Sequence, residues 1–320
     1  MKVVIIGSGI AGLTCAIYTA RAGIDTVVIT GNKYGGCVAQ APFIENFTGF
    51  ADGINGNTLM GNTIQQAEKH GVEFIYDIVV DTNFSYLEKS VTLESGEIIT
   101  ADYVVIATGS SHKTLNLVNE GKFLGKGVHY CATCDGSLYG KGNVVGVVGG
   151  GESAFQEALY LSKLCTAVHM YIRKDKARVC ATMLKRAEDT ENIIIHYNTT
   201  VECLHGDSDG YLKFIYTKTN ETRTRDTVLC IRKNEFKTNE EERRCDGLFI
   251  ALGYTPCTRV FQEHSNITVN PDGYIPVDRH YRTSTDRVYA IGDCVADVYK
   301  QAIIAAGSGA SCAMDIISRG

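Results

Sequence analysis

Two cysteines separated by two residues are the side chains in this sequence best suited to chemistry. Of its 12 cysteines, Cys131 and Cys134 form the one C-x-x-C pair. Thiols at this spacing can close a disulfide with little backbone strain, and a nearby positive field lowers the pKa of one of them. The alternative is half of a structural zinc site, which needs a second tight cluster of ligands. The sequence holds no second C-x-x-C and no C-x-x-H, so the pair favours redox chemistry and no metal site.

The remaining ten cysteines stand singly. A disulfide framework is not expected in a chain of 320 residues without a secretory signal. We interpret these residues as small, partly buried apolar side chains in a reducing compartment. They are Cys15, Cys37, Cys165, Cys180, Cys203, Cys230, Cys245, Cys257, Cys294 and Cys312.

Two glycine-rich turns form a second set of residues with chemical potential. In such a turn the first glycine permits the sharp bend, the second lets a pyrophosphate approach, and the third small residue lets helix and strand pack. The anion then lies at the helix N-terminus, where unpaired N–H groups favour it. The turns read Gly7-Ser8-Gly9-Ile10-Ala11-Gly12 and Gly149-Gly150-Gly151-Glu152-Ser153-Ala154.

The elements around both turns follow one pattern. Each turn joins an apolar strand to an amphipathic helix, and a second apolar strand follows, over residues 2–30 and 143–172. A glycine fingerprint in this context indicates a βαβ nucleotide-binding unit. We therefore predict an α/β fold with two Rossmann-like, three-layer domains, and two nucleotides that exchange electrons.

Two similar segments mark where the second domain is inserted into the first. Residues 102–109 and 246–253 both read as a buried strand that ends in a turn. We predict one discontinuous domain over 1–113 and 246–320, and a second over 114–245 that carries the C-x-x-C pair. The charged stretch at 234–244 is interpreted as a solvated turn beside a hinge.

The composition is that of a soluble globular protein, with 44% hydrophobic and 21% charged residues. A net charge of −5 argues against a nucleic-acid partner, which needs clustered Lys and Arg. No apolar run reaches the roughly 18 residues that span a bilayer. The first strand begins at once and no cleavage site follows it, so we expect a cytoplasmic protein without a membrane partner.

Several of these motifs, in this order, carry a family resemblance. The order is G-x-G-x-x-G, A-T-G, C-A-T-C-D-G, G-G-G-x-S-A, and then a late G-D followed by Q-A. From residue 1 to about residue 318 the chain resembles low-molecular-weight, bacterial-type thioredoxin reductases, which are FAD-dependent pyridine nucleotide-disulfide oxidoreductases. The C-A-T-C-D motif at 131–135 is the most specific element. The resemblance implies a thioredoxin-disulfide reductase that works as a homodimer, with thioredoxin or a thioredoxin-like protein as partner.

The resemblance also implies roles for individual residues. Cys131 and Cys134 would be the redox disulfide, with Cys134 against the flavin and Cys131 exchanging with the partner, and Asp135 would be the general acid. In the family the two domains rotate against each other, with hinges expected near His112–Leu117 and Arg244–Gly247. The FAD site would comprise Gly7, Ser8, Gly9, Ile10, Ala11, Gly35, Gly36, Asn46, Ala107, Thr108, Gly109, Gly292, Asp293, Gln301 and Ala302.

The nicotinamide side departs from the family pattern. The second turn offers Gly149, Gly151, Glu152, Ser153 and Ala154 to the nucleotide. After the following strand the family carries His-Arg-Arg-x-x-x-Arg to hold the 2′-phosphate of NADPH, whereas this chain has Ile172, Arg173, Lys174 and Arg178. The cations favour NADPH as donor, although Lys does not replace Arg at a bidentate phosphate site. NADH and ferredoxin stay open as donors.

Two smaller departures concern the flavin and the partner. Cys37 follows the paired glycines where the family has Gln; we interpret it as a packed bystander, although it could touch the flavin. Ser137 and Leu138 stand where the family offers aromatic residues to thioredoxin. An FAD-dependent dithiol oxidase and a flavoprotein redox sensor are the alternative functions. Both fit less well, because such proteins have no use for a second nucleotide fingerprint.

Overall fold

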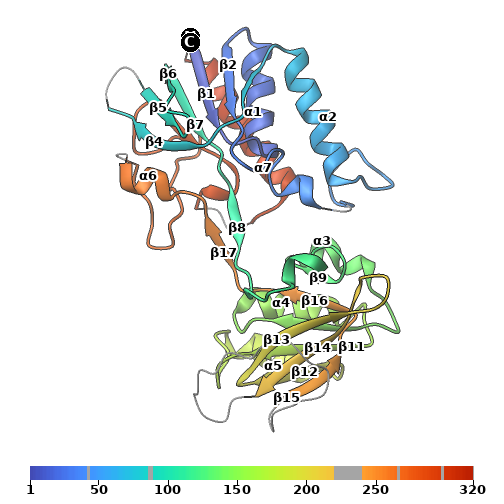
Figure 1. Ribbon diagram of the computed structural model, residues 1–320. Coiled ribbons are helices and arrows are strands. Elements are labelled where there is room, and N and C mark those ends of the chain that lie inside the picture. Colours follow the sequence, from blue (N-terminus) through green and yellow to red (C-terminus); the bar gives the residue numbers. More distant parts are fainter. Residues whose placement is uncertain (42–43, 86–88, 220–239, 265–266, 297–298, 320) are drawn as a thin grey trace. The chain divides into compact units, whose positions relative to one another are not determined.

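In a computed structural model the chain folds into two compact units (Figure 1). The described residues are 1–41, 44–85, 89–219, 240–264, 267–296 and 299–319. The first unit comprises Met1–Ser111 and Tyr254–Gly320, and the second comprises His112–Gly253. The chain passes between them along β8 (Ser110–His112) and β17 (Tyr254–Pro256), which pair in a two-stranded sheet.

The first unit is built on a parallel sheet of five strands in the order β18-β7-β1-β2-β3. The apolar run after Met1 forms the central strand. Because side chains alternate across a strand, Val3 and Ile5 face one layer of the core while Val4 and Ile6 face the other. The strands are β1 (Lys2–Ile6), β2 (Asp25–Ile29), β3 (Glu73–Ile75), β7 (Tyr103–Ile106) and β18 (Val288–Ala290).

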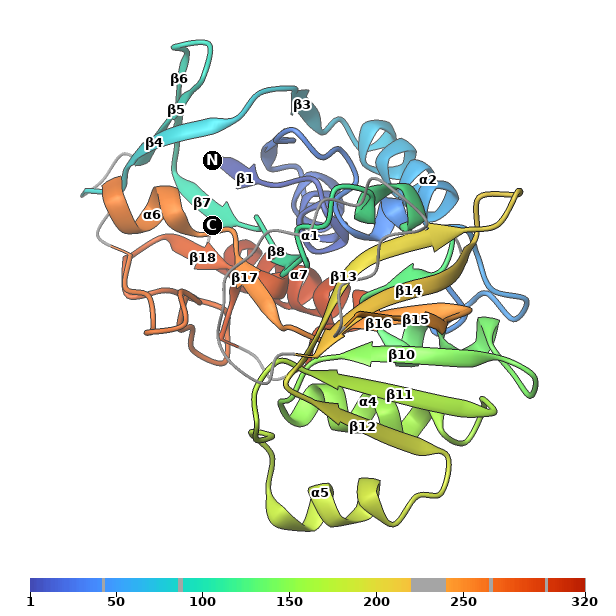
Figure 2. The same ribbon diagram turned by 60° about the horizontal axis from the view of Figure 1, so that its bottom comes forward.

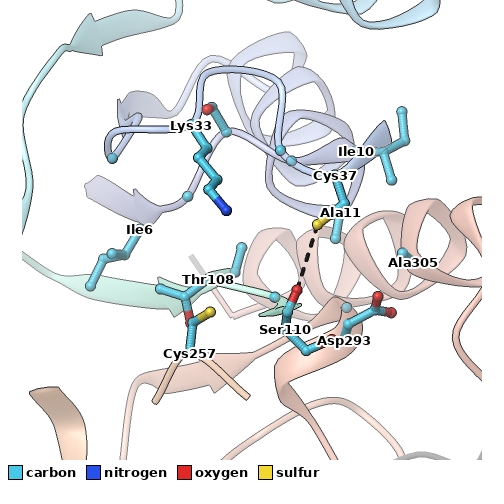
Figure 3. Close-up of a pocket in the computed structure, with 18 of the residues that line it drawn as sticks. Ile6, Ile10, Ala11, Lys33, Cys37, Thr108, Ser110, Cys257, Asp293 and Ala305 are labelled. Atoms are coloured by element: carbon cyan, nitrogen blue, oxygen red, sulfur yellow. Dashed lines mark hydrogen bonds between the residues drawn. The ribbon is translucent and has the colours of Figure 1, made fainter. Parts of the chain in front are cut away.

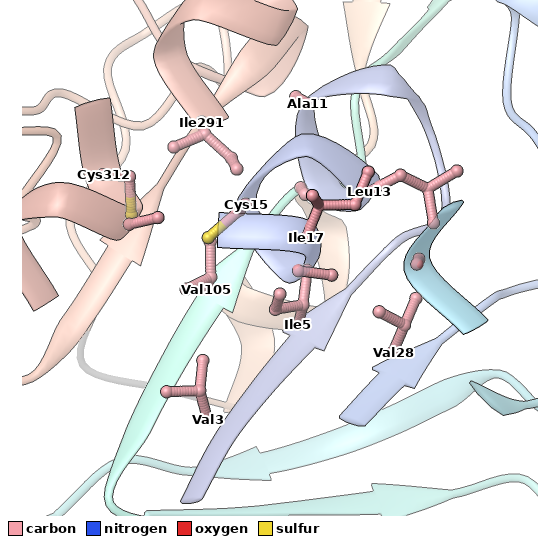
Figure 4. Close-up of a cluster of buried hydrophobic side chains, with 14 of the residues drawn as sticks. Val3, Ile5, Ala11, Leu13, Cys15, Ile17, Val28, Val105, Ile291 and Cys312 are labelled. Atoms are coloured by element: carbon pink, nitrogen blue, oxygen red, sulfur yellow. The ribbon is translucent and has the colours of Figure 1, made fainter. Parts of the chain in front are cut away.

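Helices cover one face of this sheet. Leu13, Cys15 and Ile17 of α1 pack against Val105 of the sheet and Cys312 of α7 (Figure 4). The helices of this unit are α1 (Ile10–Arg21), α2 (Gly56–Lys69), α6 (Arg259–His264) and α7 (Ala302–Ile317), with short 3-10 turns η1 (Val38–Gln40) and η4 (Gly292–Cys294). An antiparallel sheet is made by β4 (Val79–Asn83), β5 (Lys89–Leu93) and β6 (Ile98–Ala101).

The second unit repeats the same organisation. Its parallel sheet has the order β12-β11-β10-β16-β9, with the strand before the second glycine turn at its centre. Figure 2 shows α4 lying along the sheet formed by β10, β11 and β12. These elements are β9 (Val128–His129), β10 (Val144–Val148), β11 (Ala167–Ile172), β12 (Ile193–Tyr197), β16 (Gly247–Ile250), α4 (Glu152–Leu161) and α5 (Ala181–Glu188).

Three antiparallel strands pack on the opposite face of that sheet. Tyr171 and Leu248 of the sheet share a buried cluster with Leu204 and Ile215 of this meander. Its strands are β13 (Thr199–Gly206), β14 (Leu212–Thr219) and β15 (Glu240–Arg244). The redox segment adds η2 (Glu120–Phe123), α3 (Ala132–Asp135) and η3 (Gly136–Leu138). The predicted α/β fold with two Rossmann-like units is confirmed.

Two predictions about the insertion need correction. Residues 247–250 were predicted to begin the return into the first domain, but β16 pairs in parallel with β10, so it belongs to the second unit. The return therefore comes after Gly253, later than the predicted residue 246, and the exit comes at Ser111 rather than residue 113. The charged stretch is no simple turn, because 240–244 form β15; its residues 234–239 lie outside the described ones.

Among the described residues, no helix combines the length and the apolar character that crossing a bilayer requires.

Candidate functional site

The first glycine turn forms one wall of a cavity in the first unit (Figure 3). The turn follows β1 and enters α1, so it lies at the carboxyl end of the parallel sheet, where α/β folds bind ligands. Gly7 has φ +117°, and a Cβ on it would stand 2.3 Å from the carbonyl oxygen of Ala107. Only glycine therefore permits this turn. The cavity has a volume of about 540 Å³.

Most of the residues that the resemblance assigned to FAD line this cavity. They are Gly7, Ser8, Gly9, Ile10, Ala11, Gly36, Ala107, Thr108, Gly109, Gly292, Asp293, Gln301 and Ala302. Two others do not line it but contact residues that do. The Gly35 N–H donates to Ser8 Oγ at 3.3 Å, and Asn46 Nδ2 donates to Gln301 Oε1 at 3.1 Å.

The cavity wall also contains residues that the sequence analysis did not single out. Lys33 extends into the cavity (Figure 3). Lys300 also lines it, and its Nζ donates to the carbonyl oxygen of Asp293 at 3.2 Å. Two cations suit a pyrophosphate, but neither belongs to a motif that could have been recognised from sequence. Cys37 is exposed on this wall together with Cys257, so it is not the packed bystander we expected. Its Sγ donates to the carbonyl oxygen of Ser110 at 3.5 Å.

The cavity fits the pyrophosphate and polar groups of a dinucleotide such as FAD. Gly9 is the N-cap of α1 and no side chain caps the first N–H groups of the helix, which leaves them for an anion. A Cβ on Gly9 would meet nothing within 4 Å, so the backbone there faces open space. Ser110 Oγ is buried on the wall and has no hydrogen-bond partner among the described residues. Buried polar atoms are normally paired, and a ligand would supply the partner.

The second turn reproduces this geometry in the second unit. Gly149 has φ +149°, and a Cβ on it would lie 2.5 Å from the carbonyl oxygen of Ala251. Gly151 is the N-cap of α4 and no side chain caps this helix, and a Cβ on Gly151 would meet nothing within 4 Å. Glu152 and Ser153 are exposed in the first turn of α4, while Ala154 is buried beneath it. The turn therefore keeps an open, uncapped helix start that suits a phosphate.

The basic loop after β11 closes back on this turn. The Arg178 N–H donates to the Gly150 carbonyl oxygen at 2.6 Å, which holds the end of the loop beside the glycines. Arg173, Lys174 and Arg178 are all exposed. Ile172, where the family has His, is instead buried against Gly150. The structure thus brings the predicted phosphate-binding cations to the second turn.

Cys131 and Cys134 are joined by a disulfide, with their Cα atoms 5.3 Å apart. The local chain explains the pairing: Cys131 precedes the single helical turn α3, and the N–H groups of Cys134 and Asp135 both donate to its carbonyl oxygen. Both cysteines are partly exposed, whereas Ala132 between them is fully buried. The disulfide is therefore held on a fixed turn and can be approached from outside.

A buried histidine links the redox turn to the sheet. Asp135 Oδ2 lies 3.1 Å from Nδ1 of His129, whose side chain is 2% exposed. Tyr139 Oη lies 2.7 Å from His129 Nε2. Burial raises the pKa of Tyr139, so its hydroxyl stays protonated in this contact. A carboxylate only accepts, so the Nδ1–H group of His129 donates to Asp135. Sequence reasoning placed His129 beside the motif but missed this network.

Five of the ten single cysteines follow the prediction. Cys15, Cys165, Cys245, Cys294 and Cys312 are buried and free. Burial raises the pKa of Cys165 and of Cys294 to about 11, so both stay unreactive thiols. Cys203 is an exception, since it is disulfide-bonded. Cys180 and Cys257 are free but exposed. Cys230 lies outside the described residues.

Comparisons with known proteins agree with this geometry. The family model for pyridine nucleotide-disulphide oxidoreductases matches residues 1–309. The thioredoxin reductase of Streptomyces clavuligerus is 39% identical over 317 residues, covering 98% of this chain and 92% of that protein. The bifunctional thioredoxin reductase/thioredoxin of Mycobacterium leprae is 36% identical, covering 98% and 64%. The crystal structure of thioredoxin reductase from Streptococcus pyogenes matches with a TM-score of 0.87 at 30% identity, covering 99% and 96%.

The chain belongs to the pyridine nucleotide-disulphide oxidoreductase family. It is an FAD-dependent oxidoreductase, and within the family its relatives are thioredoxin reductases. The resemblance stated from the sequence is thereby confirmed.

Proposed function

We propose that this chain is a thioredoxin-disulfide reductase, which passes electrons from NADPH through FAD and the Cys131–Cys134 disulfide to thioredoxin. The observation that carries the proposal is the disulfide on the second unit, in contact with α4, the helix that follows the second nucleotide turn. When bound, FAD accepts a hydride from a nicotinamide nucleotide and returns two electrons to a disulfide. A binding module or sensor needs neither feature.

The residues of the chain take separate parts in this reaction. The cavity of the first unit holds FAD through the uncapped start of α1, with Lys33 and Lys300 adding positive charge. Cys134 receives the electrons and Cys131 exchanges with the partner. Asp135 delivers the proton that the departing sulfur needs, and its bond to buried His129 fixes its direction.

NADPH is the donor that the second turn favours. The hydrogen bond from the Arg178 N–H to the Gly150 carbonyl oxygen keeps the basic loop at the nucleotide turn. Arg173 and Lys174 stand exposed on the same loop, where they can reach a 2′-phosphate. NADH lacks that group, and a reduced ferredoxin would use neither the turn nor the cations.

Thioredoxin as partner is supported by the relatives, one of which joins thioredoxin reductase and thioredoxin in its name. The same family resemblance supports a homodimer in the cytoplasm. No nucleic-acid partner is proposed, since the net charge is −5. Sedimentation of the purified protein tests the dimer.

The experiment compares three donors under anaerobic conditions. Thioredoxin disulfide reduction is measured with NADPH, NADH and reduced ferredoxin at equal electron supply. NADPH should support the highest kcat/KM, and a Cys134→Ser variant should support none. Faster turnover with ferredoxin than with either nucleotide would show that ferredoxin, and not NADPH, is the electron donor. If a small dithiol supports oxygen uptake and no donor supports thioredoxin reduction, the protein is a dithiol oxidase and the proposed function is wrong.

A further inference from the structure

One carboxyl group lies beneath the redox turn without a part in the reaction described above. Glu157 is on α4, the helix that packs against α3. Its carboxylate accepts a hydrogen bond from the backbone N–H of Ala132, the residue between Cys131 and Thr133. Its Oε2 atom is buried and has no hydrogen-bond partner among the described residues. The side chain therefore contacts the backbone of the redox motif directly.

The surroundings of Glu157 disfavour its charged form. Burial raises the pKa of this carboxyl to about 7, Asp135 acts in the same direction, and the Ala132 N–H opposes both. From the sheet, β10 and β11 present apolar side chains to α4, namely Val145, Val147, Val168 and Met170. The charged residues of α5, which also packs against α4, are exposed: Lys185, Arg186 and Glu188. His129 bonds Asp135 from the other side.

We propose that Glu157 is a positioning residue of the redox pair, which fixes the backbone between Cys131 and Cys134 and, once ionised, disfavours a thiolate on either cysteine. The proposal deepens the proposed function and rests on Cys131 and Cys134 being the redox pair. A negative charge close to a thiol opposes loss of its proton, and the thiolate is the form that exchanges disulfides. Glu157 thus sets the pH range in which the reduced pair can attack a partner.

The test measures the acidity of the two thiols directly. Free cysteines of the oxidised protein are first blocked with N-ethylmaleimide, and the disulfide is then reduced with dithiothreitol. Alkylation of Cys131 and Cys134 by iodoacetamide is followed by peptide mass spectrometry from about pH 5 to about pH 10, which spans the thiol and the carboxyl. Glu157→Gln keeps an acceptor for the Ala132 N–H and removes the charge. Glu191→Gln, at an exposed carboxylate of the same unit, is the matched control.

The wild-type rate profile should show an inflection near pH 7 besides that of the thiol, because Glu157 titrates there. Glu157→Gln should lose this inflection and lower the apparent thiol pKa by about 0.5–1 unit, while Glu191→Gln should match the wild type. A wild-type profile with a single inflection would overturn the proposal without any variant, and so would a Glu157→Gln profile that superimposes on the wild type. This alkylation experiment uses neither nucleotide nor thioredoxin. If the protein fails to reduce thioredoxin, the proposed function is rejected, but the measured effect of Glu157 on the thiols is not.

Discussion

Replacing Asp135 by asparagine removes proton transfer by this side chain but keeps its bond to His129. The asparagine Oδ1 atom can still accept from His129 Nδ1, which lies 3.1 Å from the carboxylate in the wild type. The free energy of unfolding of this variant should therefore fall by less than about 1 kcal/mol. Asparagine cannot deliver a proton, and a positioned acid contributes about 10²–10⁴-fold. Thioredoxin turnover should fall by that factor, which is about 2.7–5.5 kcal/mol of barrier.

Replacing Asp135 by alanine removes the bond to His129 as well as proton transfer. Asp135→Ala would leave the Nδ1–H group of His129 unpaired in a site where the residue is 3% exposed. A buried donor without a partner costs about 1–3 kcal/mol, so this variant should lose stability as well as turnover. Asparagine and alanine together thus distinguish a chemical role from a structural one.

Three measurements are needed. Stopped-flow absorbance measures flavin reduction by NADPH, which should be unchanged in Asp135→Asn because no thiol chemistry is involved. Steady-state thioredoxin reduction measures the complete reaction, and urea unfolding measures stability. Normal turnover by a folded Asp135→Asn variant would refute the reasoning and move the proton donor to water or to His129.

Four further substitutions test other parts of the molecule. Cys131→Ser should abolish thioredoxin reduction but not flavin reduction by nucleotide, whereas Cys37→Ser, on the cavity wall, should keep both; equal loss in the two variants would mean that the redox pair is incomplete. Arg173→Ala should raise the KM for NADPH about ten- to a hundredfold, the worth of a charge-assisted contact, and leave the KM for NADH unchanged; equal effects on both nucleotides would count against a 2′-phosphate contact. Asp315→Asn, on α7, should lower the stability of the first unit at pH 7, because Arg282 loses the carboxylate that it pairs with. Arg282 holds the pKa of Asp315 well below its usual value, so this stability is present above the unfolded pKa of about 3.9 and is lost as pH falls further. Thermal unfolding at pH 7 and at about pH 3 measures both effects, and a gap between wild type and variant that stays constant with pH would contradict the assignment.

The parts of the fold that follow from local pattern could be predicted from sequence. Both glycine turns, the strand before each and the helix after each are short-range features, because the turn needs glycine and the flanking runs are apolar. The C-x-x-C disulfide is equally local. The placement of residues 247–250 was not, since a buried strand ending in a turn looks the same whichever sheet it joins. Pairing with β10 is decided by tertiary contacts that pattern alone does not contain.

The site was predicted least well where single residues outside any motif contribute to it. Lys33 and Lys300 belong to no motif, so nothing in the sequence connects them with the cavity. Glu157 did leave a signal. It lies three residues after Ala154 and four before Leu161, both fully buried, and so stands on the apolar stripe of α4. A carboxylate at such a position is worth examining as a functional residue.

The central claim is the path of electrons from NADPH to Cys131 and Cys134, and counting electrons tests it most directly. An anaerobic titration with NADPH follows flavin absorbance and the thiols formed per chain. We predict uptake of about four electrons, two by the flavin and two by the disulfide, with new thiols at Cys131 and Cys134 that oxidised thioredoxin then removes. A flavin that takes up two electrons while Cys131 and Cys134 stay bonded and thioredoxin stays oxidised would contradict it.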